Sequence, residues 1–201
     1  MPRVFLMFVS ALVALMAGAL FYAARIPVQV AAPQPKVEQE KAPEIVTHPS
    51  FTLPSIGGIN RELSEWDGKM RILNFWATWC APCRREIPLL KAFQDEHSID
   101  GFQVIGIAVD FPEPVAHYAK AAEFNYPILV GEQDAMAVAE SSGVEFIGLP
   151  FTMFIASSGE LLGAYIGELH QSHLDTIVDV MVRFDRSEIS SADARTALKG
   201  L

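Results

Sequence analysis

Two cysteines separated by two residues constrain this chain more than any other feature of its sequence. Cys80 and Cys83 are its only cysteines, and they stand in the run Trp79-Cys80-Ala81-Pro82-Cys83. A disulfide between them would close a very short loop, so it would remove far less unfolded-state entropy than the roughly 3 kcal/mol expected for a loop of about fifteen residues. The pair therefore predicts reversible dithiol–disulfide exchange rather than a structural cross-link.

The sequence on either side of the cysteines predicts a strand followed directly by a helix. Residues 70–76 form an apolar run, and residues 82–97 place apolar side chains at helical spacing. If the helix begins just after Cys80, this sulfur lies at the N-terminal cap, where unpaired amides and the helix dipole favour a thiolate. Cys80 is therefore the predicted nucleophile, and Cys83 is predicted to resolve the mixed disulfide. We expect Pro88 to kink this helix near its first turns.

The rest of the chain predicts an α/β fold. Alternating apolar runs and amphipathic stretches, followed by a hairpin and a last helix, indicate a sheet that is covered on both faces. Asp134 is a candidate N-cap, and the polar residues 187–201 are expected to form a fraying tail. Strands are expected at residues 102–109, 126–130, 151–155 and 160–166, and helices at residues 113–124, 134–141 and 172–184.

The first 25 residues are expected to form a membrane anchor. Residues 4–24 carry no charged side chain, and as a helix they would reach roughly 31 Å, enough to cross a bilayer core. A cleaved signal peptide is the alternative, although the apolar run exceeds the usual core of about 7–15 residues. Residues 26–49 hold five prolines among polar side chains and predict an extended tether, so residues 50–186 are the expected folded domain.

The compartment of the domain is inferred from its cysteines and its N-terminus. Basic residues flank the apolar run on both sides, so the positive-inside rule does not place the domain outside. An export-type N-terminus and the lack of any further cysteine favour an extracytoplasmic domain. The net charge of −9 argues against nucleic acid as a partner, and Arg84 and Arg85 are interpreted as a solvated helix face.

Two stretches resemble a known family. Residues 74–88, NFWATWCAPCRREIP, resemble the active-site stretch of thioredoxin-like proteins of the TlpA/ResA/DsbE group, and residues 143–152, GVEFIGLPFT, resemble the segment of that group that leads into a cis-proline. The resemblance covers about residues 50–184. It implies a thioredoxin-like fold with a mixed central sheet, and a single-pass reductase of the bacterial inner membrane whose catalytic domain lies in the periplasm.

The same resemblance implies a set of partners. They are disulfide-containing proteins of cytochrome c or cytochrome oxidase maturation, such as apocytochrome c or copper-site proteins, and a membrane thiol donor of the DsbD/CcdA kind. No cofactor and no metal are expected.

The resemblance also assigns residues to the site. It makes Pro150 the cis-proline after Leu149, although from the sequence alone Pro150 could equally start a strand. It gives Glu86 a role in proton chemistry, and a position three residues after Cys83 would place Glu86 over the same helix face. Thioredoxins proper hold a buried carboxylate where this chain has Asn74, which leaves the role of base to Glu86.

Other interpretations of the same residues remain open. Glu86 could merely complement the helix dipole, and Trp79 could be a surface aromatic, although we expect Trp79 and Leu149 to line a substrate site. A Cu(I)-binding chaperone would use Cys80 and Cys83 as ligands, but the histidines show no metal-finger spacing to them. A disulfide-donating oxidase and a peroxidase of the same broad fold are the remaining alternatives, because residues alone do not set a reduction potential.

Overall fold

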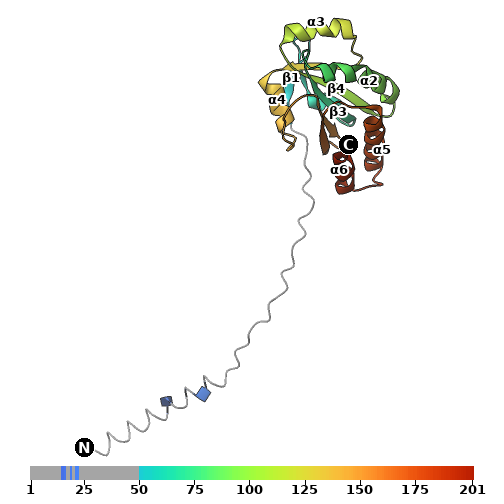
Figure 1. The fold of residues 1–201 in the computed structure, drawn as a ribbon. Helices are drawn as coiled ribbons and strands as arrows, with labels where there is room; N and C mark the ends of the chain where they lie inside the picture. The colour runs from blue at the N-terminus through green and yellow to red at the C-terminus, as the bar shows by residue number, and fades with distance from the viewer. Residues whose placement is uncertain (1–14, 17–18, 20, 23–49) are drawn as a thin grey trace, which may run out of the picture. The chain divides into compact units, whose positions relative to one another are not determined.

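The computed structural model describes residues 15–16, 19, 21–22 and 50–201 (Figure 1). Contacts divide the chain into Met1–Pro43 and Glu44–Leu201, and the second unit holds the described strands. The predicted anchor, residues 1–25, lies largely outside the described residues, and the predicted tether, residues 26–49, lies wholly outside them. Among the residues that are described, no helix combines the length and the apolar character needed to cross a membrane.

A five-stranded mixed sheet forms the centre of the second unit, with strand order β5-β4-β3-β6-β7. Within this sheet, strands β3, β4 and β5 are parallel to one another, while β6 runs antiparallel to β3 and β7 antiparallel to β6. A separate two-stranded hairpin precedes the sheet. The strands are β1 (Thr52–Pro54), β2 (Asn60–Glu62), β3 (Met70–Trp76), β4 (Phe102–Val109), β5 (Ile128–Gly131), β6 (Phe151–Ile155) and β7 (Leu161–Ile166).

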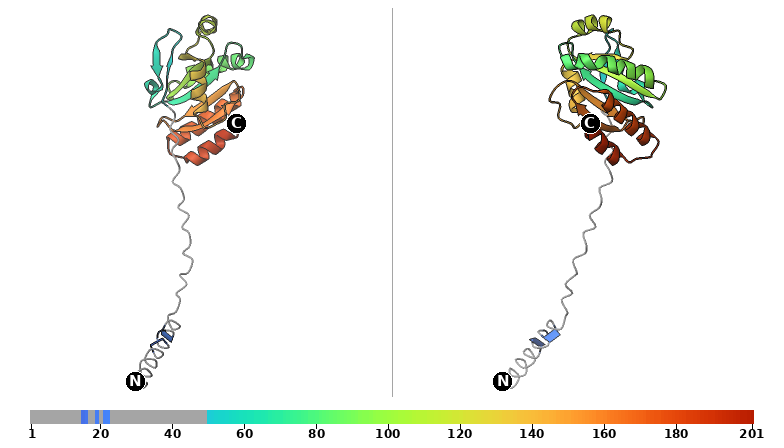
Figure 2. Two further views of the ribbon diagram at one scale, coloured as in Figure 1. Left: turned by 90° about the vertical axis from the view of Figure 1, so that its left-hand side faces the viewer. Right: turned by 45° about the vertical axis from the view of Figure 1, so that its right-hand side comes forward.

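Helices cover both faces of this sheet (Figure 2). One buried core contains the two cysteines and side chains of α2, α3, α5 and α6, and the other contains side chains of β1, η1 and α4. The predicted α/β architecture, a mixed sheet with helices on both faces, is therefore confirmed. The helices are η1 (Leu63–Trp66), α2 (Ala81–His97), α3 (Pro112–Ala122), α4 (Gln133–Glu140), α5 (Gln171–Asp185) and α6 (Ser191–Lys199).

The central strand β3 is buried along its whole length. Ile72 and Trp76 point into the first core, whereas Leu73 and Phe75 point into the second. A strand with both faces covered has no polar side to present, which is why residues 70–76 read as a continuous apolar run. The two edges of β3 pair with β4 and β6, so the site at its C-terminal end rests on a strand that is paired along both edges and covered on both faces.

One local prediction within the helices is corrected. Helix α2 continues through Pro88, which lies on the solvent-facing side, where the carbonyl that loses its donor can be hydrated, and the kink expected at Pro88 stays a prediction. Asp134 is not the N-cap of α4. The cap is Glu132, and Asp134 lies in the first turn, where its charge still complements the helix dipole.

The prediction that residues 187–201 form a fraying tail is wrong. They include α6, which is capped by the hydroxyl of Ser190 accepting from the backbone N–H of Asp193 at 3.2 Å. Ala194 and Leu198 are buried, and Leu198 packs against Gly163 of β7. Only one short apolar stripe marks this helix, so the polar composition of the segment concealed it.

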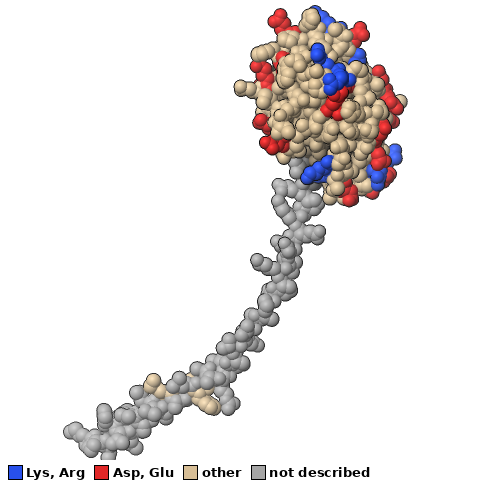
Figure 3. All heavy atoms as spheres, in the orientation of Figure 1, with Lys and Arg blue, Asp and Glu red and all other residues tan. Residues whose placement is uncertain are grey.

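The surface of the second unit carries charges of both signs. On the face drawn in Figure 3, the basic side chains stand in small groups beside acidic ones.

Candidate active site

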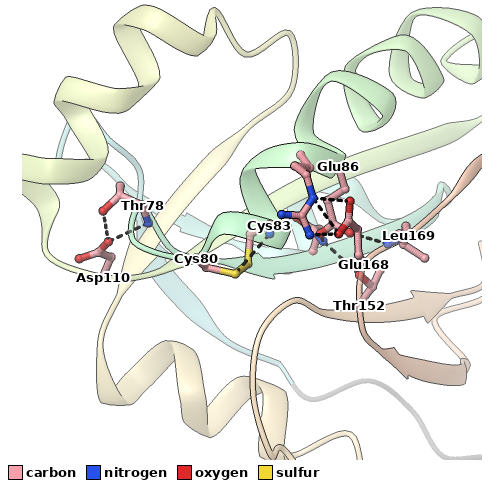
Figure 4. The surroundings of a disulfide bond; sticks show 10 residues. Thr78, Cys80, Cys83, Glu86, Asp110, Thr152, Glu168 and Leu169 are labelled. Carbon is pink, nitrogen blue, oxygen red and sulfur yellow. Dashed lines mark hydrogen bonds and ion pairs between the residues drawn. A yellow bond between two sulfur atoms is a disulfide. The ribbon is translucent and has the colours of Figure 1, made fainter.

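The two cysteines form a disulfide between the end of β3 and the start of α2 (Figure 4). Their sulfurs are 1.97 Å apart and their Cα atoms 5.3 Å apart. Cys80 retains 5% exposure, whereas Cys83 has none. A partner molecule therefore reaches Cys80 first, which agrees with its predicted role as the nucleophile.

Cys80 is the N-cap residue of α2, so the predicted start of the helix is confirmed. Its Sγ accepts a hydrogen bond from the backbone N–H of Cys83 at 3.3 Å. This donor and the positive end of the helix dipole both stabilise negative charge on Cys80. In the reduced protein, we expect both features to stabilise a thiolate at Cys80.

A buried carboxylate holds the loop that leads into the cysteines. Asp110 follows β4, and its Oδ2 accepts from the backbone N–H of Thr78 at 2.9 Å and from the Thr78 hydroxyl at 2.5 Å. Its other oxygen accepts from the backbone N–H of Phe111 at 2.8 Å. Asp110 was not predicted. The signal available was its position directly after a buried strand parallel to β3, because the carboxyl ends of parallel strands meet at one edge.

Glu86 lies buried on α2, one turn after Cys83. Its Oε1 accepts from Asn74 Nδ2 at 2.8 Å, and its Oε2 accepts from the backbone N–H of Leu169 at 2.7 Å. Burial raises the pKa of Glu86 to about 7, the two hydrogen bonds oppose this shift, and the negative charge of Glu168 adds to it. Glu86 can therefore change its protonation state near neutral pH.

Asn74 connects Glu86 on α2 to strand β6. Its Nδ2 also donates to the hydroxyl of Thr152 on β6 at 3.1 Å, while its Oδ1 has no hydrogen-bond partner. Asn74 thus orients the carboxylate that the sequence identified as the candidate base. The structure brings these residues together although 78 positions separate Asn74 from Thr152.

The predicted substrate-binding residues lie at the same end of the sheet. The peptide bond between Leu149 and Pro150 is cis, as the resemblance implied. Phe151, which follows it, pairs with Phe75 near the end of β3, so Pro150 is close to the strand end that carries the cysteines. Pro150 is buried, Leu149 is half-buried between the two cores, and Trp79 is 69% exposed.

Two basic residues after the cysteines were interpreted as a solvated helix face. Arg85 is exposed but not free, because its guanidinium forms an ion pair with Glu168, in the segment between β7 and α5. This contact spans 83 residues, so no local pattern could indicate it.

Metal binding was one of the alternatives to redox chemistry. In the part of the chain that the structure describes, no group of three or more His, Cys, Asp and Glu side chains is placed to hold a metal ion. A two-coordinate Cu(I) site on Cys80 and Cys83 would not need such a group.

Comparisons with known proteins agree with this geometry. Residues 46–165 match the model of the AhpC/TSA family. The thiol-disulfide oxidoreductase ResA of Geobacillus kaustophilus is 32% identical over 136 residues, which are 65% of this chain and 76% of that protein. The thioredoxin-like protein YneN of Bacillus subtilis is 26% identical over 136 residues, with 66% and 76% covered.

Solved structures show the same thioredoxin-like fold. A thiol:disulfide interchange protein of Chlorobium tepidum superposes with a TM-score of 0.63 at 29% identity, covering 69% of this chain and 97% of that one. The exposed lipoprotein thioredoxin Etrx1 of Streptococcus pneumoniae, at 24% identity and a TM-score of 0.55, covers 65% and 99% and supports the fold alone. The chain belongs to the AhpC/TSA family, and it is a thiol-disulfide oxidoreductase of thioredoxin-like fold.

Proposed function

We propose that this oxidoreductase reduces disulfides of partner proteins outside the cytoplasm, with Glu86 as the base that activates Cys83. The observation that carries the proposal is the buried Glu86 carboxylate, which lies one turn after Cys83 and has a pKa raised to about 7. A base with a pKa near the working pH is well matched to accepting a thiol proton. The resemblance to the ResA and DsbE group favours the reducing direction.

The first step uses the Cys80 thiolate of the reduced enzyme. It attacks one sulfur of the partner disulfide, a bond forms between Cys80 and that sulfur, and the other partner sulfur leaves as a thiolate. The Cys83 amide and the N-terminus of α2 stabilise the attacking thiolate. Trp79, Leu149 and Pro150 lie at the same end of the sheet, where we expect them to contact the flanking peptide.

The second step uses Cys83 and Glu86. The Glu86 carboxylate takes the proton of the Cys83 thiol, and the Cys83 thiolate then attacks the Cys80 sulfur. The second partner sulfur leaves as a thiolate, and the Cys80–Cys83 disulfide forms. Two electrons have moved to the partner, and the proton held by Glu86 is later lost to solvent.

The biological setting belongs to the same proposal. An apolar N-terminal segment, a Pro-rich stretch after it and the resemblance support a protein that is anchored in a bacterial inner membrane with its catalytic domain in the periplasm. There it would reduce apocytochrome c or copper-site proteins during cytochrome c or cytochrome oxidase assembly. A membrane thiol carrier of the DsbD/CcdA kind would return the electrons.

The reduction potential of the full-length chain tests the direction of electron transfer. We expect a potential clearly below that of glutathione, measured by equilibration with glutathione or dithiothreitol, and steady reduction of insulin disulfides. A strongly oxidising potential would overturn the reductase and make the protein a disulfide donor. In the Glu86→Gln variant, we expect the Cys83 thiol to titrate at a changed pH, and an unchanged titration would remove Glu86 from the mechanism.

Copper binding and peroxide turnover by the same preparation test the two remaining alternatives. Stoichiometric Cu(I) bound through Cys80 and Cys83 would support the chaperone, and peroxide-dependent oxidation at catalytic rates would support the peroxidase. We expect neither, because a buried carboxyl with a pKa of about 7, one turn after Cys83, supports disulfide exchange.

A further inference from the structure

A short segment between β7 and α5 contacts two separate parts of the active site, and Figure 4 shows two of its residues, Glu168 and Leu169. The backbone N–H of Gly167 donates to the carbonyl of the cis-proline, Pro150, at 3.0 Å. The backbone N–H of Leu169, two residues later, donates to the Glu86 carboxylate at 2.7 Å. The substrate side of the site and the proton acceptor therefore both depend on where residues 167–169 lie.

The middle residue of this segment, Glu168, forms the ion pair with Arg85. The Nε of Arg85 lies 3.1 Å from each carboxylate oxygen, and its Nη2 lies 2.5 Å from Oε2, so the two groups meet in a fork geometry. Arg85 precedes Glu86 in the chain, and Glu168 precedes Leu169. The exposed ion pair and the buried hydrogen bond consequently join the same two stretches of backbone.

Two kinds of contact hold this segment beside its amide hydrogen bonds: the Leu169 side chain is buried in the first core, and the Arg85–Glu168 ion pair holds its more exposed side. Strand β7 ends at Ile166 and α5 begins only at Gln171, so the segment belongs to neither. Gly167 has a φ of +131°, a conformation that L side chains rarely adopt. An exposed ion pair adds little to global stability, but here it fixes a connection whose two amides serve the site.

We propose that Arg85 and Glu168 are positioning residues for the reaction. Their ion pair holds the Leu169 amide on the Glu86 carboxylate and the Gly167 amide on the Pro150 carbonyl. Neither Arg85 nor Glu168 contacts the reacting sulfurs, so they act through the groups that they place. This inference rests on the proposed role of Glu86 as the base for Cys83.

Several groups contribute to the charge state of Glu86. Asn74 and the Leu169 amide stabilise its carboxylate, whereas burial and the Glu168 charge destabilise it. Burial raises the pKa of Tyr126, so this phenol stays neutral beside Glu86. The other titratable or charged side chains of this region are Cys83 and Arg85 on α2 and His170, whose charge acts on Glu168.

The test is a titration of the Glu86 carboxyl in the oxidised full-length chain, followed by the ¹³C chemical shift of labelled glutamate. The signal of Glu86 is the one that disappears in Glu86→Gln. We expect both Arg85→Gln and Glu168→Gln to raise the titration midpoint, because each loosens the Leu169 hydrogen bond. The rise should be about half a pH unit in Arg85→Gln and smaller in Glu168→Gln, where loss of the Glu168 charge lowers the pKa of Glu86. The exchanged pair, Arg85→Glu with Glu168→Arg, should return the midpoint to within about 0.2 units of the original. The matched control is Arg61→Gln, which removes the exposed Arg61–Glu65 ion pair on another part of the domain and should leave the midpoint unchanged.

The direction of the two single shifts separates positioning from simple charge effects. If the pair acted only through its charges, Arg85→Gln would raise the midpoint and Glu168→Gln would lower it. Opposite shifts, or no shift in either variant, would overturn the positioning role. The role of Glu86 as the base is tested separately, by whether Glu86→Gln changes the titration of Cys83 in the reduced chain.

Discussion

At the scale of single residues, the site is dominated by one buried carboxyl. Glu86 has two hydrogen-bond donors but no cation in direct contact among the described residues, and burial raises its pKa to about 7 from an ordinary value near 4.5. The folded protein therefore binds a proton at Glu86 more tightly than the unfolded chain does. Ionising Glu86 therefore costs more free energy in the folded protein than in the unfolded chain. This difference can be measured in the oxidised protein.

The pH dependence of stability reports this cost. The stabilisation that comes from protonated Glu86 is complete below about pH 4.5 and is lost as the pH rises through about 7. We expect the free energy of unfolding of the natural chain to fall, relative to Glu86→Gln, by on the order of 3 kcal/mol across this range. Urea unfolding of both oxidised proteins at a series of pH values measures the difference.

The control for this measurement is Glu140→Gln, which removes an exposed carboxylate at the end of α4. Its stability curve should stay parallel to that of the natural chain. Parallel curves for Glu86→Gln as well would contradict a raised pKa for Glu86.

At the scale of elements, the loop that leads into the cysteines depends on hydrogen bonds between residues that follow two parallel strands, β3 and β4. Asp110, after β4, accepts both the amide and the hydroxyl of Thr78, which precedes the cysteines on the β3 side. The acceptor is the largely buried side chain of Asp110, and removing a donor from a buried acceptor costs the desolvation of that acceptor.

Replacing Thr78 by valine removes the hydroxyl donor and keeps the shape of the side chain. We expect Thr78→Val to reduce the free energy of unfolding by about 1–3 kcal/mol in urea denaturation of the oxidised protein. Thr176→Val is the matched control, since the Thr176 hydroxyl bonds an exposed helix carbonyl at 3.0 Å and its loss should cost well under 1 kcal/mol. Equal effects of the two changes would mean that the tie to Asp110 contributes nothing specific.

Whether the sequence predicted an element correctly depended on how that element is buried. Strands β3, β4 and β6 were predicted with the bounds that the structure has, because strands covered on both faces are continuous apolar runs. Helix α6 was missed because its apolar stripe is only one residue wide at each turn.

In the site, the cysteines and Glu86 were predicted because they lie on one helix. The contacts of Thr78 with Asp110 and of Arg85 with Glu168 were not predicted, because they span 32 and 83 residues and leave no local pattern.

At the scale of the whole molecule, the folded unit extends to the end of the chain. The family model matches residues 46–165, but the segment that contacts Glu86 and Pro150 begins at Gly167, and α5 and α6 follow it. Helix α6 packs on β7, the edge strand that leads into this segment. The last helix therefore supports the strand from which the site is completed.

A large-to-small substitution in α6 tests whether this helix stabilises the domain. Leu198 is buried against β7, so we expect Leu198→Ala to reduce the free energy of unfolding by about 2–4 kcal/mol. Thr196→Ala, on the exposed side of the same helix, should change it by less than about 0.5 kcal/mol. Thermal or urea unfolding of both variants decides between a docked helix and a dispensable tail, which would tolerate the two changes equally.

The unequal exposure of the two sulfurs has a consequence for how the enzyme cycles. Cys83 has no accessible surface, so every exchange with another protein, whether it delivers electrons or removes them, must begin at Cys80. Donor and acceptor proteins therefore compete for one sulfur and cannot be bound there together. We therefore expect ping-pong turnover, in which an electron donor and a disulfide substrate use the same exposed sulfur in turn.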